Sequence, residues 1–480
     1  MTTGNSGIKL GVKWTTISSV FSTLAKFLQI VILTRFLSKA DFGIIGIALM
    51  CVNISEVFLD LGISSGVMHV QGITKNQYSS LFWLNVITGT IVYAVFVGIS
   101  PLIAAYYHEP ILEEVLPLIF LIILISSFYR LQRTIQFKEM RFKFIALTEI
   151  SSNVVMLIFS VLFAILGWGL YSLVWSTIVF YLYLSVLYLG YSLIKLKNIS
   201  FHYSNKDLKP FLKIGLFQIG NSLIDTLSSE MDTIIIGKMF SMEILGVYTL
   251  CKQLTHKVYG FINPIITKVL TPALANLQDD LSIVKKKYMQ TLYILAIINI
   301  PLYAYIAYFS PQILDIVYGE QYKDYFILLS LLCLYYAILC VGNPVGSLQV
   351  ALGRTDLGFY WSIYRTITYT IALYVGSLFE NINICVLSLV ILNIINFYPS
   401  NEMLLKKMIG LKLREYLDVY RIPLIISIFL CFVCIIHILG LNSIISLILG
   451  AVIFFPMYIL FISKFQPTLF NTLLQFVRNK

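Results

Sequence analysis

Polar side chains recur at helical spacing inside two long apolar segments of this sequence, and their types suit the binding of charged groups. Within residues 14–37 the stripe consists of Thr15, Ser19, Ser22, Lys26 and Gln29. A shift of 203 residues gives a second stripe, which consists of Gln218, Ser222, Asp225, Ser229 and Asp232. At about 100° per residue, each set shares one face of a helix. Charges near a bilayer midplane are costly and usually face a water-filled cavity or a partner, so both stripes indicate transport of a polar substrate.

The following segment of each copy carries a further polar face. Asn53, Glu56 and Asp60 share one helix face, and the same shift maps them to His256, Tyr259 and Asn263, which share a face with Lys252. Cations at this depth would bind an anionic substrate, whereas buried acids could bind H⁺ or Na⁺ and couple transport to an ion gradient. For substrate binding we predict Lys26, Lys252, Arg365, His256, Gln29 and Asn53. For ion coupling or charge pairing we predict Asp225, Asp232, Glu56 and Asp60.

Each of these residues has an ordinary structural alternative. The polar groups could form helix–helix hydrogen bonds, and the two aspartates of the second stripe could pair internally with Lys26 or Lys252. Lys26, Asp225 and Arg365 lie near the centres of their segments, where a long side chain cannot easily reach the interface. For these three we favour a position in a cavity. We expect no catalytic residue, no metal site and no cofactor beyond the coupling ion.

The elements that position these residues follow from composition. Of 480 residues, 59% are hydrophobic and 12% charged, and the mean hydropathy is +0.87, far from the roughly 25% charged of soluble domains. Helices are the expected elements because a lipid-exposed strand could not satisfy its backbone. Taking roughly 20 apolar residues per span, we predict an all-α membrane protein with fourteen spans: 14–37, 42–64, 80–104, 115–130, 144–166, 171–194, 211–236, 244–270, 288–309, 325–350, 357–378, 383–402, 422–439 and 442–463.

An internal repeat divides the chain. The string from Arg35 to Ile44 aligns with the string from Lys238 to Val247, and each copy of the repeat holds six spans, the first to sixth and the seventh to twelfth. Six is an even number, so the two lobes are parallel repeats about an axis along the membrane normal, as in many transporters. We predict an N-lobe at 1–194, a cytoplasmic linker at 195–213, a C-lobe at 211–405, and two additional spans with a tail at 406–480.

The basic residues predict the orientation. Of the 34 Lys and Arg, 26 lie in loops on the side that holds both termini, and four lie in loops on the opposite side. Basic loops stay cytoplasmic, so we expect cytoplasmic termini. The net charge of +11 therefore indicates topology and contact with anionic lipids, and it gives no support to nucleic-acid binding. Cys431 and Cys434 form a C-x-x-C pair inside an apolar span, where packing is a better interpretation than metal or redox chemistry.

Several strings resemble those of a known family. They are Leu33 to Ser38 with Asp41-Phe42-Gly43, Asp60 to Gly66, Phe137 to Lys143, Asp232 to Lys238 with Leu245 to Tyr248, and Leu348 to Arg354. Together with the two lobes, they resemble polysaccharide flippases of the Wzx/WzxC type. That family lies in the multidrug/oligosaccharidyl-lipid/polysaccharide (MOP) exporter superfamily, with the MATE drug exporters and the lipid II flippases. The resemblance covers nearly the whole chain.

The resemblance implies a function. A member would export an undecaprenyl-pyrophosphate-linked oligosaccharide from the inner to the outer leaflet of a bacterial inner membrane by alternating access, for cell-surface polysaccharide biosynthesis. It would have a cationic cavity, to which Lys26, Lys252 and Arg365 would correspond in character. A polysaccharide polymerase and a co-polymerase are possible partners.

Two alternatives remain open. A MATE-like drug or metabolite antiporter would use an anionic cavity, which Asp225, Asp232, Glu56 and Asp60 could supply. The mixed charges of the stripes and the family strings argue against it. A membrane-embedded glycan polymerase or ligase is the other, but such enzymes generally need sizeable outer loops. Here no outer loop exceeds about 17 residues and the four outer cations are scattered, so we expect a transporter and no enzyme.

Overall fold

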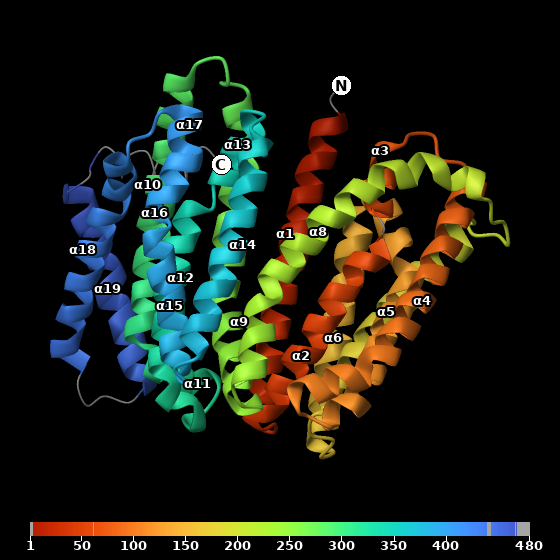
Figure 1. The fold of residues 1–480 in the computed structure, drawn as a ribbon, viewed down its shortest axis with the longest axis horizontal. Coiled ribbons are helices and arrows are strands. Elements are labelled where there is room, and N and C mark those ends of the chain that lie inside the picture. The colour runs from red at the N-terminus through yellow and green to blue at the C-terminus, as the bar shows by residue number, and fades with distance from the viewer. Residues whose placement is uncertain (1–2, 61, 439–442, 466, 468–480) are drawn as a thin grey trace. The chain divides into compact units, whose positions relative to one another are not determined.

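The computed structural model describes residues 3–60, 62–438, 443–465 and 467, and within these ranges the chain forms helices joined by turns, with no β-strand (Figure 1). Two compact units pack separately: unit 1 is Met1–Gly246 and unit 2 is Val247–Lys480. This division rests on packing, whereas the lobes of the sequence analysis rest on the repeat. The predicted lobe boundaries therefore stay a prediction.

Unit 1 is built from eight α-helices and the first residues of a ninth. They are α1 (Thr3–Leu33), α2 (Lys39–Asp60), α3 (Ile63–His69), α4 (Lys75–Tyr107), α5 (Ile111–Lys138), α6 (Phe142–Ile165), α7 (Tyr171–Tyr191) and α8 (Asn205–Met239). A π-helical turn, Ser192–Leu196, follows α7. α5 lies at the centre, because it packs against α2, α4, α6 and α7, while α1 packs on α6 and α8 packs on α2, α3 and α4.

Unit 2 takes most of α9 and all later helices. They are α9 (Met242–Ala275), α10 (Leu281–Tyr308), α11 (Ser310–Val317), α12 (Phe326–Gly342), α13 (Val345–Ala351), α14 (Thr355–Ser377), α15 (Ile382–Ile395), α16 (Phe397–Ser400), α17 (Lys406–Ile409), α18 (Leu413–Ile438) and α19 (Ser443–Phe465). A 3₁₀ turn, Glu320–Tyr325, precedes α12, and a π-helical turn, Asn401–Leu405, joins α16 to α17. α10 is central here, packing against α12 and α18.

Twelve of the described helices are long and apolar enough to cross a membrane, which confirms the predicted all-α membrane fold. α8 and α14 are also long but are not among the twelve. They correspond to the predicted spans 211–236 and 357–378, so the count of fourteen stays a prediction. Both helices carry the polar residues singled out above, Asp225 and Asp232 on α8 and Arg365 on α14, and these lower the mean hydropathy of a helix.

Side chains at the helix starts satisfy backbone N–H groups that no helical turn can pair. Thr74 and Gln77 form a reciprocal capping box at the start of α4. Ser38 and Asp41 do the same for α2: Asp41 accepts from the Ser38 backbone at 2.8 Å, and the Ser38 hydroxyl accepts from the Asp41 backbone at 3.2 Å. Asp280 caps α10, and hydrogen bonds from the Ser282 hydroxyl and from backbone N–H groups hold the pKa of Asp280 below its ordinary value.

Two glycines allow a close helix crossing in unit 1. A Cβ atom on Gly43 would overlap the Met242 carbonyl oxygen, and one on Gly246 would overlap the Lys39 carbonyl oxygen and lie 2.9 Å from the Gly43 nitrogen. Only glycine lets the backbones of α2 and the first turn of α9 approach so closely. The 203-residue shift maps Lys39 on Met242 and Gly43 on Gly246, so equivalent positions of the repeat contact each other.

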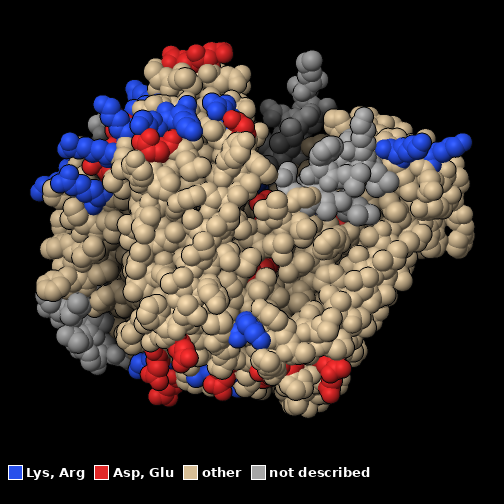
Figure 2. Space-filling model, in the orientation of Figure 1, with Lys and Arg blue, Asp and Glu red and all other residues tan. Residues whose placement is uncertain are grey.

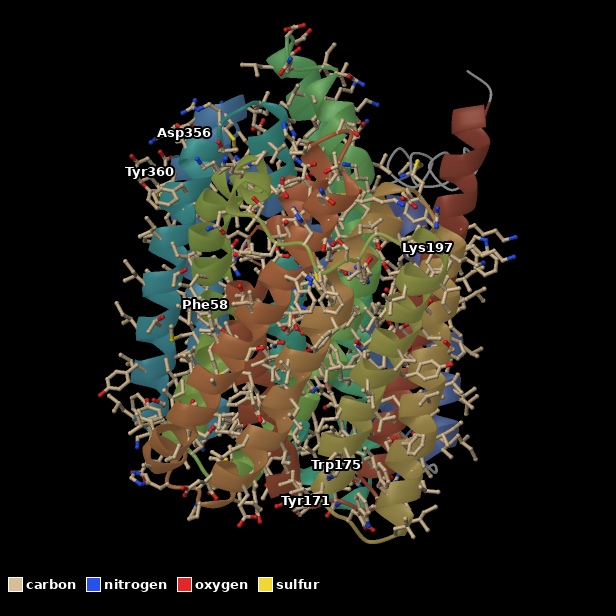
Figure 3. The ribbon with its side chains drawn as sticks, turned by 90° about the vertical axis from the view of Figure 1, so that its right-hand side faces the viewer. Phe58, Tyr171, Trp175, Lys197, Asp356 and Tyr360 are labelled. Atoms are coloured by element: carbon tan, nitrogen blue, oxygen red, sulfur yellow. The ribbon has the colours of Figure 1, made fainter. Side chains whose placement is uncertain are left out.

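The two ends of the helices differ in chemistry. In unit 2, Lys and Arg gather near α17 and the start of α10, whereas acidic residues predominate near α11 at the other end (Figure 2). In unit 1, Tyr171 and Trp175 lie at one end of α7 and Lys197 lies beyond the other (Figure 3). Aromatic residues at helix ends and a one-sided distribution of cations are both typical of proteins that span a membrane.

Candidate functional site

Two ion pairs join the central helix of unit 1 to its neighbours. Arg130 on α5 lies 3.0 Å from the Glu56 carboxylate on α2, with side chains 23% and 32% exposed. Arg133, one turn further along α5, lies 2.7 Å from the Glu149 carboxylate on α6. Arginine–carboxylate pairs in a partly buried position are held more firmly than pairs at an open surface. α5 therefore carries two guanidinium groups, one paired with a carboxylate on α2 and the other with a carboxylate on α6.

These arginines were not among the predicted site residues, because the predicted fourth span ends at residue 130 and both then count as loop cations. The helix continues to Lys138, since a hydrophobic cluster encloses its last turns: Leu131 and Ile135 pack with Leu81 and Phe211. The predicted fourth span, at sixteen residues, was shorter than a membrane requires. That shortfall was the signal that could have extended the helix and placed both arginines within one helix of membrane length.

Lys26 and Asp60, both predicted site residues, belong to the same surroundings. Glu149 lies close enough to Lys26 for an electrostatic interaction, and the Lys26 ammonium lies 5.7 Å from the centroid of the Phe180 ring. Asp60 accepts a 2.5 Å hydrogen bond from Ser64 and interacts electrostatically with Arg130. We refer to three bases and three acids as the unit 1 charge network: Lys26, Arg130, Arg133, Glu56, Asp60 and Glu149.

Tyrosine rings fill the space beside this network. Tyr129 on α5 lies between Tyr181 and Tyr188 of α7, with ring centroids 6.3 and 5.9 Å away. Each tyrosine interacts electrostatically with members of the network. Buried aromatic rings lower the local dielectric, so charge–charge interactions here are stronger than in water.

The other predicted residues of unit 1 have different surroundings. Gln29 is 6% exposed and donates a 3.4 Å hydrogen bond to Ser176 on α7, so its side chain is engaged in helix packing. Asn53 donates to the Glu230 carboxylate on α8 at 2.8 Å, a partner that the sequence placed off the polar stripe. Their predicted part in substrate binding stays a prediction.

The aspartates of α8 differ from each other. Asp232 is buried and accepts a 2.8 Å hydrogen bond from the backbone of Thr233. Asp225 is exposed, and no ion pair joins it to Lys26, although both residues lie in the described part of the chain. Only Asp225 is therefore accessible to an ion in this conformation. The side chain of Gln218 lies outside the described residues.

Unit 2 holds the remaining predicted residues. Lys252, His256 and Tyr259 follow one face of α9, with Lys252 half-buried and His256 exposed. Arg365 on α14 is exposed and interacts electrostatically with Tyr259. This interaction spans 106 residues of chain, so helical spacing could not predict it.

The cysteine pair shows no special chemistry where it is described. The Cys431 thiol lies 3.8 Å from the Ala304 carbonyl oxygen on α10, a packing contact, and the side chain of Cys434 lies outside the described residues. Among described residues, no three His, Cys, Asp or Glu side chains converge as metal ligands would.

The chain is similar to known proteins over most of its length. A family model described as a polysaccharide biosynthesis protein matches residues 32–327. The chain belongs to this family. Two relatives in it are similar over most of their length. The lipopolysaccharide biosynthesis protein WzxC of Escherichia coli K12 is 26% identical over 420 residues, covering 87% of this chain and 85% of the relative. The teichuronic acid biosynthesis protein TuaB of Bacillus subtilis is 27% identical over 424 residues, covering 88% and 86%.

Solved structures share the fold of this family member. The lipid II flippase MurJ in an inward closed conformation has a TM-score of 0.74 at 15% identity, covering 95% of this chain and 99% of that chain. A MATE multidrug transporter in an inward-facing conformation has a TM-score of 0.60 at 16% identity, covering 80% and 95%. These findings confirm the predicted resemblance to Wzx/WzxC-type flippases and the MATE-like fold. The chain is thus a member of a polysaccharide biosynthesis family with the fold of these membrane transporters.

Proposed function

We propose that this protein flips an oligosaccharide linked to undecaprenyl pyrophosphate from the inner to the outer leaflet of a bacterial inner membrane. Two relatives carry names from cell-surface polysaccharide biosynthesis, and a protein of the same fold is named a lipid II flippase. The observation that carries the proposal is that Lys26, Arg130 and Arg133 lie in helices long and apolar enough to cross a membrane, in a chain that belongs to a family of polysaccharide biosynthesis proteins.

The chemistry of such a substrate fits these side chains. A pyrophosphate with a hydrophilic glycan cannot cross hydrocarbon unaided, because desolvation of its charges costs too much. Guanidinium groups can replace water around phosphates through paired hydrogen bonds. In unit 1, carboxylates already occupy Arg130 and Arg133. A pyrophosphate would displace Glu56 or Glu149, and a freed carboxylate could then take up a cation.

Ion coupling and orientation are parts of the same proposal. H⁺ or Na⁺ would bind at Asp225, Asp232, Glu56 or Asp60 and bias the alternation between inward and outward states. Both termini and the basic linker at 195–213 would lie in the cytoplasm, as the distribution of cations favours. A polymerase would take up the flipped oligosaccharide on the outer face.

A reconstituted assay tests the proposal. Purified protein in liposomes receives a fluorescent oligosaccharide on a polyprenyl pyrophosphate, and an impermeant reagent quenches the outer leaflet. We expect protein-dependent flipping and at least a tenfold loss in the Lys26→Ala variant at equal protein content. Flipping at the wild-type rate in that variant would contradict the cationic site. Transport of an organic cation such as ethidium, without any flipping, would instead favour the MATE-like antiporter.

A further inference from the structure

One face of α18 combines two arginines with a run of apolar side chains. At about 100° per residue, six exposed residues fall within about 100° of one another around this helix. We refer to them as the α18 stripe: Arg414, Arg421, Leu424, Ile425, Ile428 and Phe432. Both arginines belong to the first three turns of the helix, and the apolar residues follow. The stripe therefore changes from cationic to apolar along the helix axis, as a phospholipid changes from its headgroup to its acyl chains.

The opposite face of α18 holds the helix in unit 2. Tyr416 and Tyr420 pack in a hydrophobic cluster with residues of α10, and Ile426 and Leu430 pack in a second cluster with residues of α10 and α19. These four side chains lie about 120–240° around the helix from Arg414. α18 and α19 lie side by side at the edge of unit 2 (Figure 1). The α18 stripe therefore points away from the packed core of unit 2.

Arg421 is an exposed cation among apolar neighbours. It lies about 12 Å along the axis from Leu413, where α18 begins, in a segment long and apolar enough to cross a membrane. Within the described part of the chain, no carboxylate forms an ion pair with Arg421 or Arg414, and Asp418 between them forms none with either. A cation on the outer face of a spanning helix is costly unless an anionic group meets it. The stripe therefore needs an anion from outside the chain.

Both guanidinium groups can reach the same phosphate. Arg414 and Arg421 are about 10 Å apart along the helix axis. Side chains on a helix lean toward its N-terminus, so an extended Arg421 leads back toward Arg414 and the start of α18. Guanidinium groups bind phosphate oxygens through paired, charge-assisted hydrogen bonds. The apolar residues from Leu424 to Phe432 then lie where the acyl chains of the same lipid extend.

The end of unit 2 at which α18 begins is strongly basic. Lys285 pairs with Glu415 at 2.7 Å and joins the start of α10 to the start of α18. Lys286 and Lys287 follow Lys285 on α10, and Lys407 belongs to α17, which packs on α10. Figure 2 shows Lys and Arg gathered at this end. Such a surface attracts anionic lipids and raises their concentration beside the α18 stripe.

We propose that the α18 stripe binds one anionic glycerophospholipid, such as phosphatidylglycerol, in the leaflet at the basic ends of the helices. Its phosphodiester lies between Arg414 and Arg421, and its acyl chains lie along Leu424, Ile425 and Ile428. The general attraction of basic loops for anionic lipid requires no particular residue. This site, in contrast, requires two arginines on one face of one helix. The proposal is independent of the transported substrate, because the stripe points away from the core of unit 2.

Lipid retention by the purified protein tests the site directly. The full-length protein in detergent is titrated with dioleoyl phosphatidylglycerol, and bound lipids are counted by native mass spectrometry. We expect the first phosphatidylglycerol to bind about tenfold more tightly than further copies and than zwitterionic dioleoyl phosphatidylethanolamine. Arg414→Gln and Arg421→Gln should each weaken this first binding by about fivefold or more, because each removes a pair of phosphate donors. Arg421→Lys retains the charge without the paired donors and should lose less.

Matched controls keep the outcome interpretable. Lys407→Gln removes an exposed cation from the same basic end but outside the α18 stripe, and it should bind phosphatidylglycerol as the wild type does. Soluble glycerol 1-phosphate carries the phosphate without acyl chains, so equimolar amounts should not displace the lipid. Elution as a monodisperse peak shows that each variant is folded.

Four results would overturn the site. Equal losses in Lys407→Gln and Arg421→Gln would show that lipid retention follows net charge. Equal affinity for phosphatidylethanolamine would remove the requirement for an anionic lipid, and displacement by equimolar glycerol 1-phosphate would remove the part assigned to the apolar residues. Tighter binding of undecaprenyl phosphate, lost in the same arginine variants, would assign the stripe to a polyprenyl lipid instead. Loss of phosphatidylglycerol from Arg421→Gln while this variant still flips its substrate supports the site and leaves the proposed function intact.

Discussion

Adding one methyl group to Gly43 should loosen the crossing of α2 with the start of α9. The new Cβ would overlap the carbonyl oxygen of Met242 and lie 2.9 Å from its carbonyl carbon. Both atoms belong to a helical backbone, so no side-chain rotation can relieve the contact. In Gly43→Ala the two helices must therefore move apart or tilt.

The size of the effect follows from packing energies. Overpacking of a close contact costs about 1–3 kcal/mol, and alanine recovers about 0.5–1 kcal/mol because it is a better helix former than glycine. For a unit of this size, each kcal/mol lowers the melting temperature by about 2–4 °C. We expect Gly43→Ala to melt several degrees below the wild type. Gly246→Ala should behave alike, and the double variant should lose less than the sum, because both substitutions widen the same crossing.

The change in melting temperature is measured by heating the protein in detergent and recording the loss of its monodisperse elution peak. Gly98→Ala on α4 is the control, because nothing lies within 4 Å of the added methyl group. It should melt at or slightly above the wild-type temperature. If Gly43→Ala and Gly246→Ala both have the same melting temperature as Gly98→Ala, the close crossing does not exist in solution and the reasoning is refuted.

Four further predictions follow from the same structure. Arg130→Gln should destabilise unit 1 by about 1–3 kcal/mol by leaving the Glu56 carboxylate without its partner. Adding Glu56→Gln should restore part of the loss in a double-mutant thermal cycle, and strict additivity would contradict the pair. Asp225→Asn should slow gradient-driven flipping in energised vesicles more than gradient-independent equilibration, and equal loss in both would speak against coupling. Reporter enzymes inserted in the linker at 195–213 should be active in the cytoplasm, and a periplasmic signal would reverse the topology. Asp280 has a lowered pKa, so its charged cap stabilises α10 above the usual carboxyl range of about 3.9 and loses this effect as the pH falls through the folded-state value. The melting temperature of Asp280→Asn should thus fall below that of the wild type at pH 7 and match it once the pH lies below the lowered pKa of Asp280; a gap independent of pH would exclude a role for the charge.

Helical spacing predicted the fold well, because an apolar segment of membrane length has few other structures available. The same rule placed Lys26 on the face where the unit 1 charge network lies. Helical spacing could not distinguish a residue that faces the network from one that packs against a helix. Gln29, one turn from Lys26, was therefore assigned to the site, although its side chain donates a hydrogen bond to Ser176 on α7. A 100° period assigns directions around a helix but does not reveal which neighbour occupies each direction.

Two parts of the candidate site depend on information that spacing does not contain. Arg130 and Arg133 belong to the candidate site because α5 continues to Lys138, and the position of that helix end depends on packing against other helices. Arg365 lies within electrostatic range of Tyr259, although the two residues are far apart in the chain. Long-range contacts of this kind are set by tertiary packing.

The arginines of α5 also constrain how the protein enters the bilayer during synthesis. An arginine at the centre of an inserting helix costs about 2.5–3.5 kcal/mol. Arg130 and Arg133 lie in the second half of α5, where a smaller part of this cost applies to each, so counter-charges still favour its insertion. Glu56 precedes it in the chain and is already present on α2 when α5 emerges. Glu149 follows immediately on α6, after a connection of only three residues. The order of the helices thus supplies one counter-charge before α5 and one directly after it, and α5 and α6 should leave the insertion machinery together as a hairpin.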